Sequence, residues 1–475
     1  MFNFDYSYLS LPKKFHSLTK PSSCPFPEIF LLNQKLINKF NLQLTQKKIL
    51  DVLFDKNNYK KSFAQNYAGH QFGYFTKLGD GRAIIIGEHL LKNNLRIDIQ
   101  LKGAGLTKYS RNGDGKATLR SMIREYLISE AMHYLNISSS RSLGVIKSGE
   151  SILRQNLEDG GVLVRMMKSH IRIGTFEYAS YFGSSKDLKH LTSYTINRLY
   201  PHISNSENPP LALLNTVMNK QIDLVVNWMR VGFIHGVMNT DNTSISAESF
   251  DYGPCAFINS YNPSKVYSSI DHNGRYAFGN QPKVIKWNIC RFAESLIPII
   301  NENKKIAIEL AQSVIDKFDS IWKKKYYSMM LNKIGIFENK KSLHSLIDEL
   351  LSIMENNNMD FTNTFWYLSQ QKISKTQFNS DSNFVLWQKK WNNYIKKMSC
   401  LKESKQIMKK NNPIIIPRNH VVNEVIEKAM NGNTDSLNKL LKALTKPYQK
   451  QEGIHEYTTP TNSHVDACFQ TYCGT

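Results

Sequence analysis

The strongest constraint on the fold is an unbroken alternation of apolar and polar residues over residues 95–102. A period of two predicts a β-strand with one face on a core and one polar face. Lys102 lies at the end of this strand, on its polar face. Short apolar runs at residues 83–87 and 162–167 predict further strands. We therefore expect residues 75–170 to form a sheet that presents Lys102.

Residues 117–135 predict a helix. Ser121 and Glu125 fall at helical spacing on one polar stripe, while Ile123 is one of several apolar residues able to pack on a core. A Gly-rich turn at residues 112–115 precedes this segment and can deliver the chain to the helix start. A helix carrying Glu125 is therefore expected after the strand carrying Lys102.

Most of the remaining chain is predicted to be helical. The first 50 or so residues are expected to form a helical or irregular lead-in. Residues 232–282 are rich in Gly, Asn and Asp and contain no long periodic element, which is typical of a functional segment. Helical patterns cover residues 211–230, which end at Gly232, and residues 284–331 and 341–475.

The chain of 475 residues has 61 basic and 39 acidic residues, a net charge of +22. This charge would attract nucleic acid, acidic proteins or nucleotide phosphates, or it reflects a Lys-rich composition without function. The lysines are scattered, and the clusters at 323–325 and 409–410 are not interleaved with aromatic residues, which argues against a nucleic-acid groove. No apolar run approaches the ~18 residues of a membrane span, and the first residues do not resemble a signal peptide. We expect a cytoplasmic protein with no membrane partner.

Three features follow one another in the order found in the N-lobe of protein kinases. Gly79 and Gly81 lie in a turn before a strand, where glycine lets backbone amides approach phosphates. Lys102 comes one strand later, and Glu125 lies on the following helix. Each feature alone is more often a plain turn, a surface lysine or a solvated glutamate. Their order indicates a site in which the Glu orients the Lys toward phosphate.

A second group of residues can be aligned with the C-lobe of a kinase. His235 and Asn242 match the first and last residues of the catalytic-loop motif H-R-D-x-x-x-x-N. The Asp-Tyr-Gly triplet that begins at Asp251 matches D-F-G, whose Asp holds metal. Val237 stands where a kinase has its base, and valine cannot accept a proton. The site is therefore either inactive or used for different chemistry.

Three arginines would add positive charge to the N-lobe side of this site. Arg82, Arg165 and Arg172 have the planar side chain that binds phosphate through two hydrogen bonds. Together with Lys102 they supply more charge than a kinase normally needs, which favours a triphosphate tail buried deep, with its α-phosphate near the metal. Arg165 and Arg172 are equally expected to form structural ion pairs.

Longer motifs occur in order along nearly the whole chain. They are N-Y-A-G-H-Q-F-G at 66–73, L-G-D-G-R at 78–82, L-K-G-A-G at 101–105, Y-S-R-N-G-D-G at 109–115, H-G-V-M-N-T-D-N at 235–242, D-Y-G-P at 251–254, G-R-Y at 274–276 and P-R-N-H at 417–420. With these motifs the chain resembles the selenoprotein O family of protein adenylyltransferases, also called the YdiU family.

The resemblance implies an α+β, protein-kinase-like (pseudokinase) fold of two lobes with a helical C-terminal extension. Residues 1–175 would form an N-terminal extension and the N-lobe, residues 176–335 the C-lobe, and residues 336–475 the extension. The protein would bind ATP in a flipped orientation and transfer AMP to Ser, Thr or Tyr hydroxyls of other proteins, with UTP as an alternative donor.

The resemblance also implies roles for single residues. Asp241 would accept the proton of the acceptor hydroxyl, Glu125 would pair with Lys102, and Asn242 and Asp251 would hold Mg²⁺ or Mn²⁺. The residues implied to contact the nucleotide are Gly79, Gly81, Arg82, Lys102, Asp114, Gly115, Arg165, Arg172 and Asp251. A non-catalytic, nucleotide-binding scaffold is the alternative suggested by Val237, although an inactive fold has no need to keep metal ligands.

The six cysteines are widely spaced and form no CxxC pair, which predicts reduced thiols rather than a zinc site. The family is thought to use a C-terminal cysteine in redox control, a role that would fall to Cys473. Members often carry a partner cysteine before an Asp-His motif, but residues 266–272 contain none. Cys255, beside the expected metal loop, is the candidate partner.

Overall fold

The computed structural model describes residues 2–42, 46–54, 59–370, 381–398 and 400–472. Within this part of the chain nine strands form one sheet, in the order β2-β4-β6-β7-β9-β8-β3, with β1 paired to β6 and β5 to β4. The strands are β1 (Phe4–Asp5), β2 (His16–Leu18), β3 (Glu28–Leu32), β4 (Phe63–Gln71), β5 (Tyr74–Gly79), β6 (Ala83–Leu90), β7 (Arg96–Lys102), β8 (Arg141–Leu153) and β9 (Leu157–Met167).

The predicted Lys102 strand is confirmed as β7, which lies between β6 and β9. Lys102 pairs with Ala83 on one side and with Leu163 on the other. The predicted runs at 83–87 and 162–167 lie within β6 and β9, which are both longer than the apolar patterns. Lys102 is therefore held in the centre of the sheet by strands on both sides.

The predicted helix is α3 (Leu119–Tyr134), which packs on β8 and β9. It begins at Leu119 because the Thr118 side chain accepts a hydrogen bond from the Ser121 amide. Glu125 and Ser129 are buried, so the polar stripe of this helix faces the protein interior and not solvent. That orientation puts the Glu125 carboxylate within reach of the sheet.

Two apolar layers cover the two faces of the sheet. One contains Ile123 and Leu127 of α3 and continues into the helical half of the molecule. The other packs β6, β7, β8 and β9 against the short helices α1 (Gln34–Lys39) and α2 (Gln46–Phe54). Both sheet faces are buried, so the central strands are fixed in register.

The expectation of a helical or irregular lead-in is wrong at three short strands within residues 4–32. Short strands β1, β2 and β3 join the sheet by pairing with β6, β4 and β8 respectively. Their partners lie far along the chain, and strands of two to five residues are too short to show a period of two. The sheet also begins earlier than residue 75, because β4 starts at Phe63.

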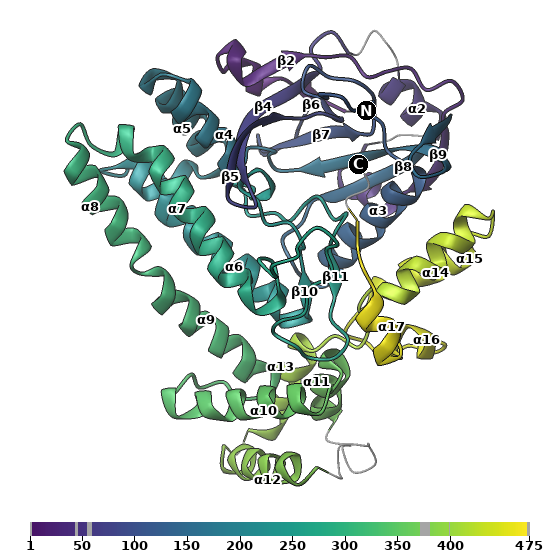
Figure 1. Cartoon of the computed structure of the whole chain (residues 1–475), viewed down its shortest axis with the longest axis vertical. Helices are drawn as coiled ribbons and strands as arrows, with labels where there is room; N and C mark the ends of the chain where they lie inside the picture. The colour runs from purple at the N-terminus through teal and green to yellow at the C-terminus, as the bar shows by residue number, and fades with distance from the viewer. Residues whose placement is uncertain (1, 43–45, 55–58, 371–380, 399, 473–475) are drawn as a thin grey trace.

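The helical half below the sheet is confirmed (Figure 1). The helix α6 ends at Val231, and Gly232 follows in the left-handed conformation at φ 75°, as the sequence indicated. Two short paired strands, β10 (Phe233–Ile234) and β11 (Ala256–Phe257), lie in the first half of the irregular segment. The helices of this half are α4 (Ile173–Phe182), α5 (Ser185–Leu199), α6 (Pro209–Val231), α7 (Gln281–Ile300), α8 (Lys304–Ile315) and α9 (Phe318–Lys333).

The C-terminal region is helical and returns to the sheet. Its helices are α10 (His344–Asn356), α11 (Phe361–Gln370), α12 (Ser382–Lys397), α13 (Leu401–Asn411), α14 (Asn419–Met430), α15 (Asp435–Leu444), α16 (His455–Thr458) and α17 (Ser463–Cys468). Both α14 and α15 contact α3, and Figure 1 shows them beside it. Arg120 of α3 pairs with Glu427 of α14. None of the helices in the described residues has the length and apolar character to cross a membrane.

Candidate functional site

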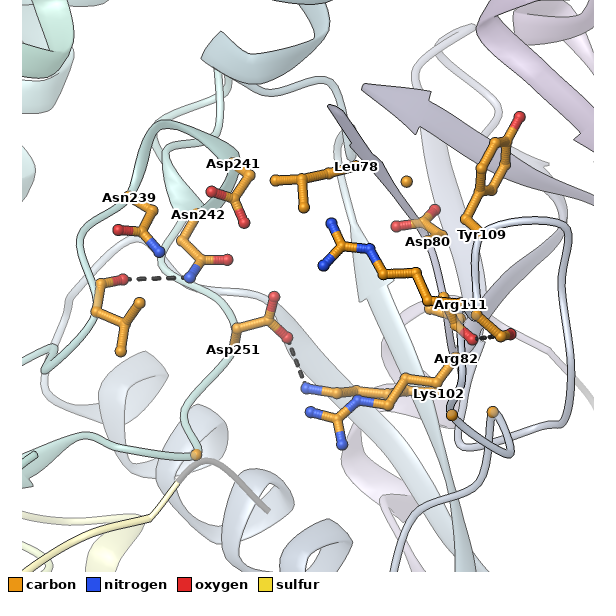
Figure 2. Close-up of a pocket in the computed structure, with 18 of the residues that line it drawn as sticks. Leu78, Asp80, Arg82, Lys102, Tyr109, Arg111, Asn239, Asp241, Asn242 and Asp251 are labelled. Atoms are coloured by element: carbon orange, nitrogen blue, oxygen red, sulfur yellow. Dashed lines mark hydrogen bonds and ion pairs between the residues drawn. The ribbon is translucent and has the colours of Figure 1, made fainter. Parts of the chain in front are cut away.

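A cavity of about 490 Å³ lies between the sheet and the loops of the helical half. Figure 2 shows its two walls: Asn239, Asp241, Asn242 and Asp251 on one side, and Arg82, Lys102, Arg111 and Tyr109 on the other. The predicted site residues that line it are Gly79, Gly81, Arg82, Lys102, Asp114, Gly115, Arg165, Arg172, Asp241, Asn242 and Asp251. The structure thus brings together residues of both predicted lobes, from Gly79 to Asp251 along the chain.

The turn between β5 and β6 carries Gly79 and Gly81 and lies against Tyr109 and Ser110. A Cβ at Gly79 would lie 2.3 Å from the Tyr109 ring, and one at Gly81 would lie 2.9 Å from the Tyr109 carbonyl oxygen. The Ser110 hydroxyl donates to the Gly81 carbonyl, and the Thr107 hydroxyl donates to the Asp80 carbonyl at 2.7 Å. Glycine is required here by close packing, which holds the turn against the 107–110 segment.

Four charged side chains form a buried cluster at the back of the cavity. Lys102 Nζ lies 2.6 Å from a carboxylate oxygen of Glu125 and 2.6 Å from one of Asp251. Arg165 of β9 also pairs with both carboxylates, at 2.5 Å for Asp251. The predicted Lys102–Glu125 pair is therefore present, and Glu125 contributes to the site through Lys102 without being one of the residues that line the cavity.

The cations set the protonation of the two carboxyl groups in this cluster. Burial alone would raise the pKa of Asp251, but Arg165 and Lys102 outweigh it and hold that pKa well below its usual range. Burial likewise opposes ionisation of Glu125, and the same two cations lower its pKa. Both groups are therefore carboxylates at neutral pH. The cluster contains two positive and two negative charges, as a buried arrangement requires.

Asn242 and Asp251 present side-chain oxygens on the wall opposite Arg82. Asn242 belongs to the short 3-10 helix η5 (Thr240–Asn242), and its side-chain nitrogen donates to the Val237 carbonyl at 3.2 Å. This bond turns the amide oxygen away from Val237, toward the side where Asp251 lies (Figure 2). Asp251 adopts a left-handed backbone with φ 61°, which is uncommon outside glycine.

This pair of residues fits a divalent cation that is bound partly by phosphate. No group of three or more His, Cys, Asp or Glu side chains suited to a metal occurs in the described residues. Mg²⁺ is commonly held by one or two protein oxygens together with substrate phosphates and water. The carboxylate of Asp251 and the oriented amide oxygen of Asn242 match that requirement, whereas a structural zinc site would need N or S ligands.

Asp241 lies beneath β4 on the same wall. A Cβ at Gly69 would lie 2.8 Å from its Oδ1, so the strand passes directly over the carboxyl group. Oδ1 is buried and has no hydrogen-bond partner among the described residues. Burial raises the pKa of Asp241 to about 6, against the lowering effect of Arg172. A carboxylate of raised pKa at a cavity wall, with one oxygen that has no hydrogen-bond partner among the described residues, is suited to accept a proton.

Arg172 precedes α4 and is buried at the cavity wall. Its guanidinium stacks on the Tyr67 ring at 4.0 Å and lies 3.3 Å from Asp80 Oδ1. The structural pair expected for this arginine is therefore present, and Arg172 also lines the cavity, while its contact with nucleotide stays a prediction. Asp80 itself accepts from the Gln65 amide at 3.1 Å, which fixes its position.

Asp114 and Gly115 line the outer edge of the cavity. Asp114 accepts two hydrogen bonds from Arg154, at 2.9 and 3.0 Å, and the pair is partly exposed. Sequence reasoning missed Arg154 and also Arg111, whose motif was recognised without a role for its arginine. A third lining residue, Asp80, was also missed, because in the sequence it lies between Gly79 and Gly81 and was treated only as part of their turn.

Of the two cysteines expected to form a redox pair, Cys255 and Cys473, the structure describes only Cys255. Cys255 is buried, and its thiol donates to the Tyr252 carbonyl at 3.1 Å. Burial raises the pKa of that thiol to about 12, so it is not poised to react. Cys473, the expected redox residue, lies outside the described residues.

The fold is a mixed α/β architecture in which a charged cavity lies between the sheet and the helical half. The family model "Protein adenylyltransferase SelO" matches residues 1–445. The chain is 47% identical over 479 residues to protein nucleotidyltransferase YdiU of Pelagibacter ubique (strain HTCC1062), covering 100% of this chain and 99% of that one. It is 45% identical to the proteins of the same name from Clostridium perfringens (strain SM101 / Type A) and Bacillus cereus (strain AH820), covering 100% of this chain and 98% of each. The chain belongs to the SelO family and is an enzyme of the nucleotidyltransferase class.

Among solved structures, a rhoptry antigen kinase domain of Toxoplasma gondii is similar at a TM-score of 0.23 and 10% identity, over 61% of this chain and 86% of that one.

Proposed function

We propose that the protein transfers AMP from ATP to Ser, Thr or Tyr hydroxyls of other proteins, with ATP reversed relative to its orientation in a kinase. The observation that carries the proposal is the arrangement of the cavity. Its cations Arg82 and Lys102 face a wall that holds Asn242, Asp251 and Asp241, and Asp241 Oδ1 has no hydrogen-bond partner among the described residues. In this proposal, a wall of cations that binds phosphate faces a wall that carries the metal ligands Asn242 and Asp251 and the base Asp241.

In this reaction the acceptor hydroxyl oxygen forms a bond to the α-phosphorus, and the bond from that phosphorus to the pyrophosphate oxygen breaks. Asp241 takes the hydroxyl proton, which Val237 at the kinase position cannot do. Lys102, held by Glu125, and Arg165 stabilise the charge of the departing pyrophosphate. A Mg²⁺ or Mn²⁺ ion held by Asn242 and Asp251 would neutralise the phosphoryl oxygens under attack.

The remaining residues of the nucleotide site follow from the lining of the cavity. The backbone at Gly79 and Gly81 approaches the phosphates, with Arg82 and Arg172 beside them. Asp114 and Gly115, at the outer edge, contact the rest of the nucleotide. We propose that residues 1–175 and 176–335 are the two lobes that meet at this cavity, and that residues 336–475 form a helical extension.

Labelling from ATP tests the reaction directly. Incubation with acceptor proteins, Mg²⁺ or Mn²⁺ and α-³²P-ATP is expected to label protein, whereas γ-³²P-ATP is expected to give none, because the γ-phosphate leaves with pyrophosphate. α-³²P-UTP measures whether the site also accepts a uridine nucleotide. Label from the γ-phosphate alone would show an atypical kinase. ATP-dependent thermal stabilisation without any label would show a nucleotide-binding scaffold.

A Gly69→Ala variant tests the role of Asp241. The added methyl would lie 2.8 Å from Asp241 Oδ1, so the carboxyl group must move. Displacing a catalytic group by about 1 Å can cost up to about 100-fold in rate, so we expect AMP transfer to fall by about ten- to 100-fold. ATP affinity, measured by calorimetry, should change much less.

The matched control for Gly69→Ala is Thr76→Ala. Thr76 pairs with Gly69 on β5 and faces the same side of the hairpin, but it contributes only a 3.5 Å hydrogen bond to the Tyr74 carbonyl. We expect this variant to keep nearly full activity. Equal rates for the two variants would contradict the placement of the base under β4.

A further inference from the structure

The tip of the β4–β5 hairpin is bonded to the catalytic loop of the helical half. The His70 amide donates to the Thr240 hydroxyl at 2.7 Å, and the Phe72 amide donates to Asn239 Oδ1 at 3.1 Å. Thr240 directly precedes Asp241 in η5. Two backbone amides just after Gly69, the residue that covers Asp241, therefore join the sheet to the loop.

A buried glutamate of α4 completes this connection. One carboxylate oxygen of Glu177 lies 2.5 Å from His70 Nδ1, and the other accepts from the Thr240 hydroxyl at 2.5 Å. The Glu177 side chain is 2% exposed, so these bonds form away from solvent. The Thr240 hydroxyl donates to Glu177 and accepts from the His70 amide, which fixes it from two directions.

We propose that Glu177, Thr240 and His70 form a positioning triad that sets the place of the Asp241 carboxyl for proton transfer. The proposal rests on the proposed function of Asp241. The three residues come from α4, the catalytic loop and β4, so they join three separate elements at one point. Loss of one of these hydrogen bonds would let the loop move and would change the position of Asp241 relative to Gly69. The two residues are packed so closely that a Cβ at Gly69 would lie 2.8 Å from Asp241 Oδ1.

The triad acts on the chemical step and not on nucleotide binding. Glu177, Thr240 and His70 are not among the residues that line the cavity, whereas Asn239 and Asp241 beside them are. Loss of the triad is therefore expected to lower kcat while leaving the affinity for ATP nearly unchanged. This separation distinguishes positioning of Asp241 from a general role in holding the site together.

The test compares Thr240→Val with Thr240→Ser in the full-length protein. Valine keeps the shape of threonine but removes the hydroxyl, so the His70 amide loses its acceptor and Glu177 loses a donor. Serine keeps the hydroxyl and both bonds. We expect Thr240→Val to lower kcat for AMP transfer by about ten- to 100-fold. Thr240→Ser is expected to keep kcat within about threefold of wild type. Glu177→Gln, which keeps the side-chain volume, should also lower kcat.

Hydrogen–deuterium exchange gives a readout that does not depend on activity. The His70 amide bonds directly to the Thr240 hydroxyl, so its exchange should be about tenfold faster in Thr240→Val and unchanged in Thr240→Ser. Faster exchange with an unchanged kcat would overturn the positioning role, as would equal losses of kcat in the valine and serine variants. If the wild type transfers no AMP, the proposed function fails. The triad is then judged by exchange alone, and equal exchange in all three proteins would overturn it.

Discussion

Asp251→Asn is expected to lower AMP transfer by about 1000-fold or more. Asp251 is one of two proposed oxygen ligands for the metal, and the loss of its charge removes several kcal/mol of stabilisation of the phosphoryl oxygens. Asn is tolerated in the left-handed conformation that this position requires, so the backbone should be kept. The measurement is kcat from α-³²P-ATP at saturating nucleotide, over a titration of Mg²⁺ and Mn²⁺.

The contacts of the Asp251 carboxylate show why this residue matters for the metal site. The same carboxylate oxygen of Asp251 contacts both Lys102 and Arg165. The other carboxylate oxygen of Asp251 takes part in neither contact and is the atom available to a metal. Asp80→Asn is the control: Asp80 lines the same cavity but contacts Arg172 at 3.3 Å, on the wall opposite Asp241. Activity of Asp251→Asn above that of Asp80→Asn at any metal concentration would refute the assignment.

Glu125→Ala should lower the free energy of unfolding by about 3–5 kcal/mol, because it removes one carboxylate from a buried cluster. Lys102 and Arg165 would be left with Asp251 alone, in a site where both cations are at most 7% exposed. The measurement is urea unfolding of wild type and variant. Glu427→Ala is the control, since its pair with Arg120 is on the surface and should be worth less than about 1 kcal/mol.

The effect of Glu125→Ala should also depend on pH in a known direction. The folded-state pKa of Glu125 is lowered, so its carboxylate stabilises the fold fully above the unfolded pKa of about 4.3. That contribution is lost as pH falls through the folded pKa. The difference between wild type and variant should therefore be constant near neutrality and shrink in acid. A difference that grows as the pH falls would contradict the ion-pair cluster.

The sequence predicted the parts of the site that depend on local pattern. Lys102 and Glu125 could be placed because a strand period and a helix period each extend over enough residues to define a face. Asn242 and Asp251 could be placed because motif spacing in a short loop limits where they lie. In each case the position of the residue followed from the order of elements, before any contact was known.

The parts that could not be predicted depend on contacts between distant segments. The strands of residues 4–32 join the sheet through partners in β4, β6 and β8, and no local pattern indicates such pairing. Glu177 lies on a helix where it reads as an ordinary solvated glutamate, and only the fold brings it to His70 and Thr240. The burial of Asp241 under Gly69 likewise comes from the approach of two halves of the molecule.

The contact of α14 with α3 has a consequence for the order in which the protein is made. Glu125 points from α3 into the ion-pair cluster, while Arg120 and Arg124 of the same helix reach Glu427 and Asn423 of α14. A ribosome synthesises α14 about 300 residues after α3, at roughly 5–20 residues per second. For that interval, some tens of seconds, α3 lacks these two contacts. The contacts of α14 with α3 therefore form late in synthesis.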